Sequence, residues 1–264
     1  MKYVIITGAS GGMGNAVARA LVDAGYGVIA MDKEAPCIEG ASLSVGADVR
    51  SETELSEAFK RVAAITDRLY AVLHFSGIYM LDSLVEMSEE RMLSAYDVNL
   101  FGVMRINRIF LPLLGEGSRI IITSSELAPL DPLPFTGIYA LTKSALDKYA
   151  YSLRMELQLL GIHVSVLRPG AVDTGMLGAS TRELDNFIQR TELYSCNADR
   201  FKRIVDSVEA RRIPAERIAR VAKKLLEARR PRQTVSINRN PLLLLLNLLP
   251  DRLATYIIKV ILKG

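Results

Sequence analysis

The first 25 residues contain the pattern that most limits how this chain can fold. Residues 3–6 are an apolar run expected to form a buried strand, Thr7–Gly14 is rich in glycine, and apolar residues then recur at helical spacing up to Gly25. Glycines at positions 8, 12 and 14 let the backbone approach a pyrophosphate, whose charge the N-terminus of the following helix favours. The spacing is G-x3-G-x-G, so the order of strand, glycine turn and helix carries the prediction of a dinucleotide site.

Strand-like and helix-like stretches alternate through the rest of the chain. Strands are expected over residues 27–31, 43–47, 70–75, 119–124, 162–167 and 234–237. Helices are expected over 52–65, 88–114 and 137–160, with another opening at Ile213-Pro214, and residues 88–114 fit either one helix or two, the second ending near Pro112 and Gly115. This alternation predicts one α/β domain over residues 1–240, a doubly wound Rossmann-type fold with a parallel sheet and helices on both faces. Residues 175–212 interrupt the rhythm, and an insertion of this length is typical of a lid or binding wall.

Residues 241–264 form an apolar C-terminal appendage to this domain. A transmembrane span needs about 20 consecutive apolar residues, whereas Pro250, Asp251, Arg252 and Lys259 interrupt this stretch. A two-piece amphipathic element fits better. It can lie on a membrane surface, cover the mouth of a substrate site or pack against another subunit, and packing on protein is the preferred interpretation.

Charge is unevenly distributed. Residues 200–264 contain 16 Lys+Arg and 5 Asp+Glu, a net charge of +11, whereas residues 1–199 contain 17 and 24, a net charge of −7. Most of these residues fit solvated helix faces, and the alternative is a basic edge that meets anionic lipid or an acidic substrate. No nucleic-acid partner is expected, because the chain has neither a basic run interleaved with aromatic residues nor a binding motif.

The remaining composition favours a cytoplasmic protein. Met1-Lys2 leads directly into a short apolar run, which does not resemble a targeting segment. The two cysteines, Cys37 and Cys196, lie far apart in the sequence and fit free thiols in a reducing compartment. With only two histidines, no metal site is expected.

A phenol, an ammonium and a hydroxyl group are predicted to meet at one site. In a helix over residues 137–160, Tyr139 and Lys143 lie at i and i+4, about one turn apart. Ser125 follows the apolar, β-branched run 119–124, so a buried strand presents its hydroxyl towards that pair. Tyrosine keeps its proton to about pH 10. The lysine and an oxidised nicotinamide are expected to lower the pKa of the phenol and allow proton transfer with an alcohol or carbonyl oxygen. Tyr-x3-Lys alone is also a common helix-surface pattern.

Other polar residues follow predicted strands at the edge where ligands bind in such sheets. Asp32, after the second strand, can accept hydrogen bonds from both adenosine ribose hydroxyls and repel a 2′-phosphate, which favours NAD over NADP, although the adjacent Lys33 could compensate a phosphate. Pro169-Gly170 and Thr174 follow a later strand and can clamp a cofactor from its nicotinamide side. Asn99 lies in an apolar stretch, and the local sequence fits either a kinked turn or a site residue.

Taken together, these motifs resemble the short-chain dehydrogenase/reductase family, closely over residues 3–174 and more loosely over 214–237. The resemblance implies catalytic roles for Asn99, Ser125, Tyr139 and Lys143, with Asn99 supporting a water relay, and a contact between Asp48 and the adenine ring. It implies a cofactor site formed by Thr7, Gly8, Ser10, Gly12, Met13, Gly14, Asp32, Asp48, Val49, Gly77, Asn99, Tyr139, Lys143, Pro169, Gly170, Val172 and Thr174.

Two departures from the family pattern stand out. His74-Phe75-Ser76-Gly77 replaces the family's Asn-Asn-Ala-Gly, and the spacing from Ser125 to Tyr139 is one residue longer than expected, which leaves Ser124 as a second candidate for the serine role. Both histidines, at positions 74 and 163, are interpreted as structural.

The resemblance implies an oxidoreductase that moves hydride between a nicotinamide cofactor and a secondary alcohol or ketone. The long insertion and apolar tail resemble those of hydroxysteroid and retinol dehydrogenases, so a lipophilic, steroid-, retinoid- or long-chain-like substrate is expected. The alternatives are an NADPH-dependent 3-ketoacyl-type reductase and a nucleotide-binding relative without catalysis. A homodimer or homotetramer is expected from the resemblance, and the tail leaves peripheral membrane contact open.

Overall fold

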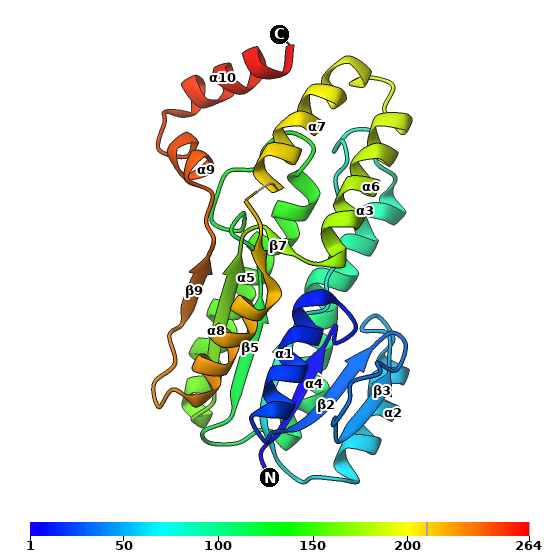
Figure 1. Ribbon diagram of the computed structural model, residues 1–264, viewed down its shortest axis with the longest axis vertical. Coiled ribbons are helices and arrows are strands. Elements are labelled where there is room, and N and C mark those ends of the chain that lie inside the picture. Colours follow the sequence, from blue (N-terminus) through cyan, green and yellow to red (C-terminus); the bar gives the residue numbers. More distant parts are fainter. Residues whose placement is uncertain (210, 264) are drawn as a thin grey trace.

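A computed structural model describes residues 1–209 and 211–263, with the side chains of 175–182 and 206–209 outside the description. In this part of the chain a seven-stranded sheet has the order β3-β2-β1-β4-β5-β6-β9, with every pairing parallel. Its strands are β1 (Tyr3–Thr7), β2 (Gly27–Asp32), β3 (Leu43–Gly46), β4 (Leu69–His74), β5 (Arg119–Thr123), β6 (His163–Pro169) and β9 (Thr234–Ile237). The predicted parallel sheet is confirmed (Figure 1).

Helices cover both faces of the sheet. Helices α1 (Gly12–Asp23) and α8 (Ala215–Glu227) pack on one face, where Val4 and Ile6 of β1 point. Helices α2 (Glu52–Ala63) and α4 (Gly102–Phe110) pack on the other face with Ile5, and α5 (Gly137–Leu157) covers β5 and β6 there. Because successive side chains of a strand point to opposite faces, these buried β1 residues contribute to two cores. This is the expected doubly wound α/β arrangement.

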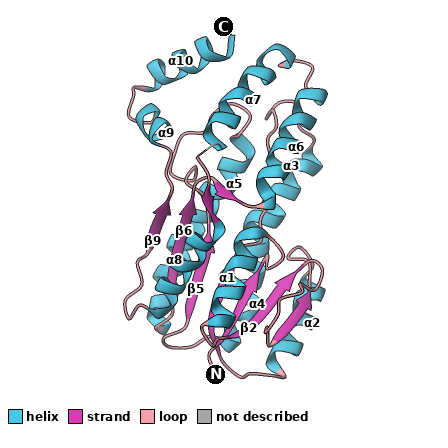
Figure 2. Cartoon of the chain, in the orientation of Figure 1, coloured by secondary structure: helices cyan, strands magenta, loops and turns pink. Residues whose placement is uncertain are grey.

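The order of the strands places a ligand-binding crevice beside β1. The chain moves outward from β1 through β2 to β3, then returns to β4 on the other side of β1. In an open parallel sheet, the crevice outside the carboxyl ends of the strands lies where the order reverses. In Figure 2 the strands point towards the upper group of helices, so the carboxyl edge of the sheet faces that group.

The helix expected over residues 88–114 is divided by a π-helical turn. Helix α3 (Glu89–Tyr96) continues through η1 (Asp97–Phe101) into α4 and then into a 3₁₀ turn, η2 (Leu111–Leu113). Asn99 lies within η1 and is almost fully buried. Such π turns occur frequently at functional sites. Helix α5 likewise ends in a 3₁₀ turn, η3 (Gln158–Leu160), before Gly161, whose φ of 70° suits glycine.

The insertion predicted at residues 175–212 contains two helices, α6 (Gly175–Arg190) and α7 (Ser195–Glu209), flanked by the short paired strands β7 (Val172–Asp173) and β8 (Ile213–Pro214). Phe187 and Phe201 are buried with Phe135 from the loop before α5, which forms a second apolar cluster above the sheet. Met176 and Leu177, two apolar residues of this insertion, lie outside the described side chains. Scattered hydrophobic residues did not reveal these helices in the sequence.

The C-terminal segment forms two helices, as expected for a two-piece element. Helix α9 (Pro241–Leu246) follows β9, and α10 (Asp251–Lys263) packs Leu262 into the apolar cluster that contains Phe201 of α7. The side-chain amide of Asn197 donates to the carbonyl of Leu262 at 2.8 Å. No helix in the described part of the chain is long and apolar enough to cross a membrane.

Candidate functional site

The glycine turn between β1 and α1 forms a close-packed cradle. Gly8 has a φ of 69°, and a Cβ atom there would lie 2.4 Å from the backbone nitrogen of Ser76. A Cβ on Gly14 would lie 2.1 Å from the carbonyl oxygen of Gly8, and one on Gly12 would lie 2.7 Å from the side chain of Thr174. Side chains therefore cannot fill this turn, which leaves backbone N–H groups at the start of α1 accessible to an anionic group. The residues present fit the pyrophosphate of a dinucleotide.

A cleft of about 1090 Å³ runs along this turn, lined by Gly8, Ser10, Gly12, Met13, Gly14 and Thr174 among others. A smaller cavity of about 150 Å³ continues from it and is lined by Ser125, Tyr139, Lys143, Pro169, Gly170 and Val172. Met13, Gly77 and Thr174 line both spaces. Residues predicted to hold the pyrophosphate and the nicotinamide side of a cofactor therefore border one continuous crevice.

The residues expected at the adenosine end lie outside that lining. The carboxylate of Asp32 accepts hydrogen bonds from the backbone N–H groups of Ser10 and Lys33, each at 2.8 Å. It is thereby fixed beside the glycine turn at the end of β2. Asp48 is held by Arg50 with a 2.7 Å ion pair, and this partner keeps the pKa of its carboxyl group below the usual value. Val49 packs against Gly102 at the start of α4.

At the opposite end, the predicted phenol, ammonium and hydroxyl group come together. The hydroxyl of Ser125 forms a hydrogen bond with the phenol of Tyr139. The ammonium of Lys143 lies 5.8 Å from the centre of the Tyr139 ring and donates to the carbonyl of Thr123 at 3.2 Å. The extra residue between Ser125 and Tyr139 therefore does not prevent their contact. Ser124, the second candidate, instead donates to the carbonyl of Lys143 at 3.3 Å.

Burial controls the ionisation of this pair. It raises the pKa of Tyr139 to about 12, the hydrogen bond from Ser125 opposes that change, and the negative charge of Glu126 adds to it. Burial lowers the pKa of Lys143 to about 8, against the influence of Asp147. The shift of the tyrosine is thus opposite to the expected one, because desolvation of the phenolate exceeds the stabilisation that the protein's own groups provide. A second group, the positive charge of an oxidised nicotinamide, is also expected from the sequence to lower the pKa of Tyr139.

Asn99 connects the π turn to both sides of the site. Its amide accepts the N–H of Ile78 at 2.8 Å and donates to the carbonyl of Ile78 at 3.0 Å and to the hydroxyl of Thr142 at 3.1 Å. A Cβ on Gly77 would lie 3.3 Å from the Asn99 side-chain oxygen and 3.5 Å from the Lys143 nitrogen. Asn99, Gly77 and Lys143 therefore converge, as the resemblance implied.

The neighbouring strand ends are held by residues with structural roles. His74 is buried, contacts the Asn107 side-chain oxygen at 2.8 Å and has its pKa lowered by burial to about 4. It is a neutral strand-end residue and does not line the crevice. The side-chain oxygen of Thr7 accepts a long hydrogen bond, 3.5 Å, from the backbone nitrogen of Ser76. This contact holds the His74–Gly77 stretch that replaces the family's Asn-Asn-Ala-Gly. Among the residues that the structure describes, no group of three or more His, Cys, Asp or Glu side chains could hold a metal ion.

Three residues at the reaction end were not identified from the sequence. The ring of Tyr79 packs edge-on against that of Tyr139, with centroids 4.7 Å apart. Glu126 and Leu243 line the smaller cavity, Leu243 from α9. Glu126 could have been noticed as a charged residue next to Ser125 at a strand end. Leu243 carries no comparable signal, because 118 residues separate it from Ser125 and only the fold brings them together.

Known proteins resemble this chain in sequence. Estradiol 17-beta-dehydrogenase 2 of Mus musculus is 33% identical over 193 residues, which cover 67% of this chain and 50% of that protein. The uncharacterized oxidoreductase YbbO of Escherichia coli (strain K12) is 34% identical over 181 residues, 66% of each chain. The chain spans about half the length of the estradiol 17-beta-dehydrogenase 2 proteins of mouse and rat.

Solved structures share the fold at lower identity. A short chain dehydrogenase family protein from Francisella tularensis has a TM-score of 0.74 at 19% identity, over 90% of this chain and 97% of its own. A short chain dehydrogenase from Burkholderia cenocepacia, in complex with NADP, has a TM-score of 0.70 at 22% identity, over 89% and 96%. The family model described as short chain dehydrogenase matches residues 2–185, more than half of the sequence. The chain belongs to the short-chain dehydrogenase family.

Proposed function

We propose that this protein is an oxidoreductase that transfers hydride between NAD and a lipophilic secondary alcohol or ketone. The observation that carries the proposal is the meeting of Ser125, Tyr139 and Lys143 at the end of a crevice that begins at the glycine turn. An alcohol carbon bound there would face the nicotinamide end of a cofactor whose pyrophosphate lies at α1. The nucleotide supplies the hydride chemistry, and the protein orients the reactants and moves the proton.

In the oxidation direction, Tyr139 takes the proton of the substrate hydroxyl. A nicotinamide held beside Pro169, Gly170 and Thr174 would supply the acceptor for the hydride of the same alcohol carbon. Ser125 donates a hydrogen bond to the substrate oxygen, and the ammonium of Lys143 stabilises the phenolate. In the reduction direction, the neutral phenol that burial favours is the required proton donor. Asn99 holds the loop at Ile78 against α5 and supports a water relay.

The preference for NAD over NADP rests on Asp32. Its carboxylate is held by two backbone N–H groups beside the glycine turn, where a ribose 2′-phosphate would meet a fixed negative charge. Ser10 and Lys33 provide these N–H groups, so rotation of the carboxylate away from a phosphate would break both bonds. The flexible side chain of Lys33 is exposed, and a solvated ammonium compensates a phosphate only weakly.

A lipophilic substrate is supported by the walls of the smaller cavity, to which Tyr79, Leu127, Val172 and Leu243 contribute. We assign residues 1–240 to the catalytic domain, with 175–212 as a wall above the crevice, and residues 241–264 to a segment that completes the pocket. The alternative of a 3-ketoacyl-type reductase would require NADPH, whose ribose 2′-phosphate the carboxylate of Asp32 disfavours.

The test is turnover of a panel of secondary alcohols and ketones, including steroids, retinoids and long-chain compounds, with each cofactor. Thermal-shift measurements with NAD and NADP report binding in parallel. We expect NAD to raise the melting temperature more than NADP and to support oxidation of at least one lipophilic alcohol. Tight NAD binding without turnover of any compound would favour the alternative of a non-catalytic relative.

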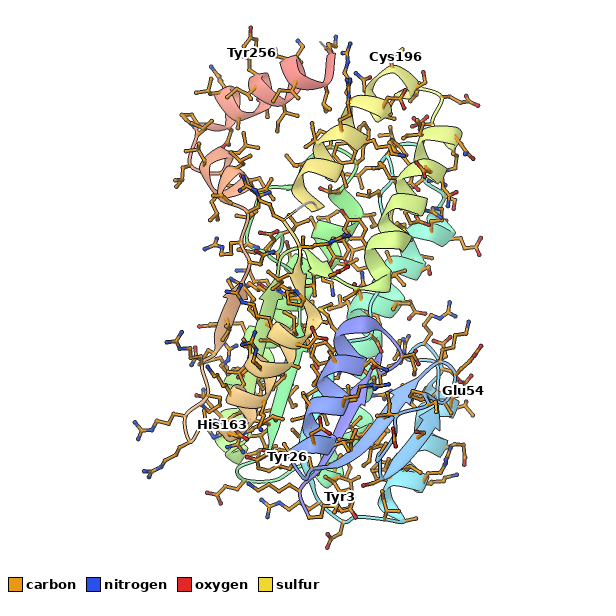
Figure 3. All side chains as sticks on the ribbon, viewed as in Figure 1. Tyr3, Tyr26, Glu54, His163, Cys196 and Tyr256 are labelled. Atoms are coloured by element: carbon orange, nitrogen blue, oxygen red, sulfur yellow. The ribbon has the colours of Figure 1, made fainter. Side chains whose placement is uncertain are left out.

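The C-terminal helices support contact with the surface of an anionic membrane by an otherwise cytoplasmic protein. Apolar side chains stay exposed along the two helices and the turn between them, up to 81% for Leu248 in that turn, and Tyr256 lies at the outer edge of α10 (Figure 3). The basic residues Arg252, Lys259 and Lys263 are exposed on α10. Sedimentation with vesicles of phosphatidylserine and phosphatidylcholine should carry down the protein, and Leu248→Glu should reduce this. Equal sedimentation of the two proteins would count against it.

A further inference from the structure

The side chain of Glu126 joins the end of β5 to the C-terminal segment. It follows Ser125, is only 6% exposed and lines the smaller cavity. One carboxylate oxygen accepts the backbone N–H of Asn240 at 2.6 Å, across 114 residues of sequence. Asn240 is the N-cap residue of α9, and its own side chain accepts the N–H of Leu242 at 2.9 Å. Glu126 therefore holds the residue that caps the helix whose Leu243 lines the cavity.

The same carboxylate packs against the turn predicted to contact the nicotinamide. Its other oxygen lies 2.7 Å from the position that a Cβ on residue 170 would occupy, so only glycine fits beside it. The N–H of Glu126 donates to the carbonyl of Pro169 at 2.9 Å. Glu126 thus lies between the Pro169-Gly170 turn and the C-terminal segment, in contact with both.

Two further contacts fix the C-terminal segment against the site. Asn238, with a φ of 59°, donates from its side chain to the carbonyl of Ala171 at 2.9 Å. The N–H of Asp131, in the loop after Glu126, donates to the side chain of Asn247 at 2.7 Å. These two hydrogen bonds and the one from Asn240 to Glu126 hold the C-terminal segment beside the smaller cavity. Of the three, the hydrogen bond to Glu126 is buried.

Glu126 also places a negative charge near the reacting phenol. Burial raises the pKa of Glu126, opposed by the N–H of Asn240 and the charge of Arg239. Tyr139 and Lys143 on α5 are the other ionisable residues that line the smaller cavity with Glu126. Arg239, in the loop before α9, is the positive charge that acts on Glu126. Its charge adds to the effect of burial in raising the pKa of Tyr139.

We propose that Glu126 is a positioning residue whose buried carboxylate fastens α9 across the substrate pocket and holds a negative charge beside the phenol of Tyr139. The proposal rests on the proposed function, because it assigns both effects to the reaction at Tyr139. The fastened helix narrows the pocket with Leu243, so it selects among lipophilic substrates. The charge opposes formation of the phenolate, so it moves alcohol oxidation to higher pH.

The two effects separate in a pair of variants. Glu126→Gln keeps an oxygen that can accept the Asn240 N–H but removes the charge. We expect a nearly unchanged KM for the best lipophilic alcohol. The ascending limb of kcat for alcohol oxidation, which follows ionisation of the Tyr139 phenol, should move to lower pH. Glu126→Ala removes both, and loss of a hydrogen bond to a charged group predicts a KM rise of about tenfold or more. Its pH profile should shift like that of Glu126→Gln.

Variants at Asn240 and in α9 test the hydrogen bond between Glu126 and Asn240 from the side of its donor. The φ of −77° at Asn240 suits proline, so Asn240→Pro deletes the donated N–H, whereas Asn240→Ala deletes only the side-chain cap. The KM should rise more in Asn240→Pro than in Asn240→Ala. Leu243→Ala should raise KM without a pH shift. Leu242→Ala, on the same helix and 65% exposed, should change neither.

An unchanged pH profile in Glu126→Gln, or an unchanged KM in both Glu126→Ala and Asn240→Pro, would overturn the proposal. Melting temperatures identify a variant that has not folded, and the Asn240 pair then tests the fastening without any change at Glu126. Failure of the proposed function looks different, because the wild-type protein itself would then turn over no member of the alcohol and ketone panel.

Discussion

At the scale of single residues, the site contains two ionisable groups that burial drives towards their neutral forms. The pKa of Tyr139 is raised to about 12 and that of Lys143 is lowered to about 8. A neutral phenol can donate a proton to a ketone, whereas alcohol oxidation needs the phenolate. A positive charge close to the ring favours that phenolate, and the ammonium of Lys143, 5.8 Å from the ring centre, is the protein group placed to supply it.

Replacement of Lys143 by methionine tests this role. The variant removes the ammonium from beside the ring while it keeps most of the side-chain volume. Because less positive charge then favours the phenolate, the pKa of Tyr139 should rise and the pH dependence of alcohol oxidation should move to higher pH. Initial rates across a pH series measure the shift. A profile that coincides with that of the wild type would remove the electrostatic role of Lys143.

The sequence could predict these residues because each has a local signal. Tyr139 and Lys143 are one helical turn apart, and Ser125 closely follows an apolar strand. The direction of the Tyr139 pKa shift could not be predicted, since it depends on how completely the fold excludes water. Glu126 gains its role only through a contact with Asn240, far away in the sequence.

At the scale of elements, the glycine turn could be predicted from the sequence because only glycines fit the close backbone contacts between β1 and α1. The strand, turn and helix follow one another in the first 23 residues as expected, and the positions of Gly8, Gly12 and Gly14 leave no room for side chains. The local sequence around Asn99 did not distinguish a kinked turn from a site residue. The π turn brings Asn99 into contact with Thr142 and close to Gly77, which are distant in the sequence. Helices α6 and α7 were missed for a related reason, since their apolar faces pack on Phe135.

Substitution of Gly14 by alanine should destabilise the turn. The added Cβ would lie 2.1 Å from the carbonyl oxygen of Gly8, so the backbone itself must move. Overpacking typically costs about 1–3 kcal/mol, which lowers the melting temperature by several degrees, and NAD should no longer raise it. Gly115→Ala is the control, because nothing lies within 4 Å of its Cβ position. Equal melting temperatures and NAD responses in the two variants would refute the steric argument.

At the scale of the whole molecule, the sheet brings together residues from both halves of the chain at one edge. The parallel alternation in the sequence predicted that edge, and the return of the chain from β3 to β4 opens the crevice there. The C-terminal helices were expected, but their connection to the site depends on side-chain contacts that no local pattern encodes. The exposed apolar residues of α4, η2 and α5 have no covering element in the described chain: Met104, Leu111, Leu141, Tyr151 and Met155.

This surface predicts self-association. A second copy packed on α4 and α5 would bury side chains that are now up to 60% exposed, as for Tyr151. Light scattering should give the mass of a dimer or tetramer, and Tyr151→Glu with Met155→Glu should lower it. Leu193→Glu, on the turn between α6 and α7, changes an equally exposed apolar residue elsewhere and should leave the mass unaltered. A monomeric wild-type protein would exclude this interface.

The account depends most on proton transfer by the phenol of Tyr139, and Tyr139→Phe removes only that oxygen. The decisive measurement compares the rate of NAD reduction by a lipophilic alcohol in the wild type and in this variant, with NAD binding followed by thermal shift. General acid–base catalysis predicts a loss of about 10²- to 10⁴-fold in kcat, while NAD still raises the melting temperature of the variant. A variant that binds NAD and still turns over the alcohol at the wild-type rate would contradict the assignment.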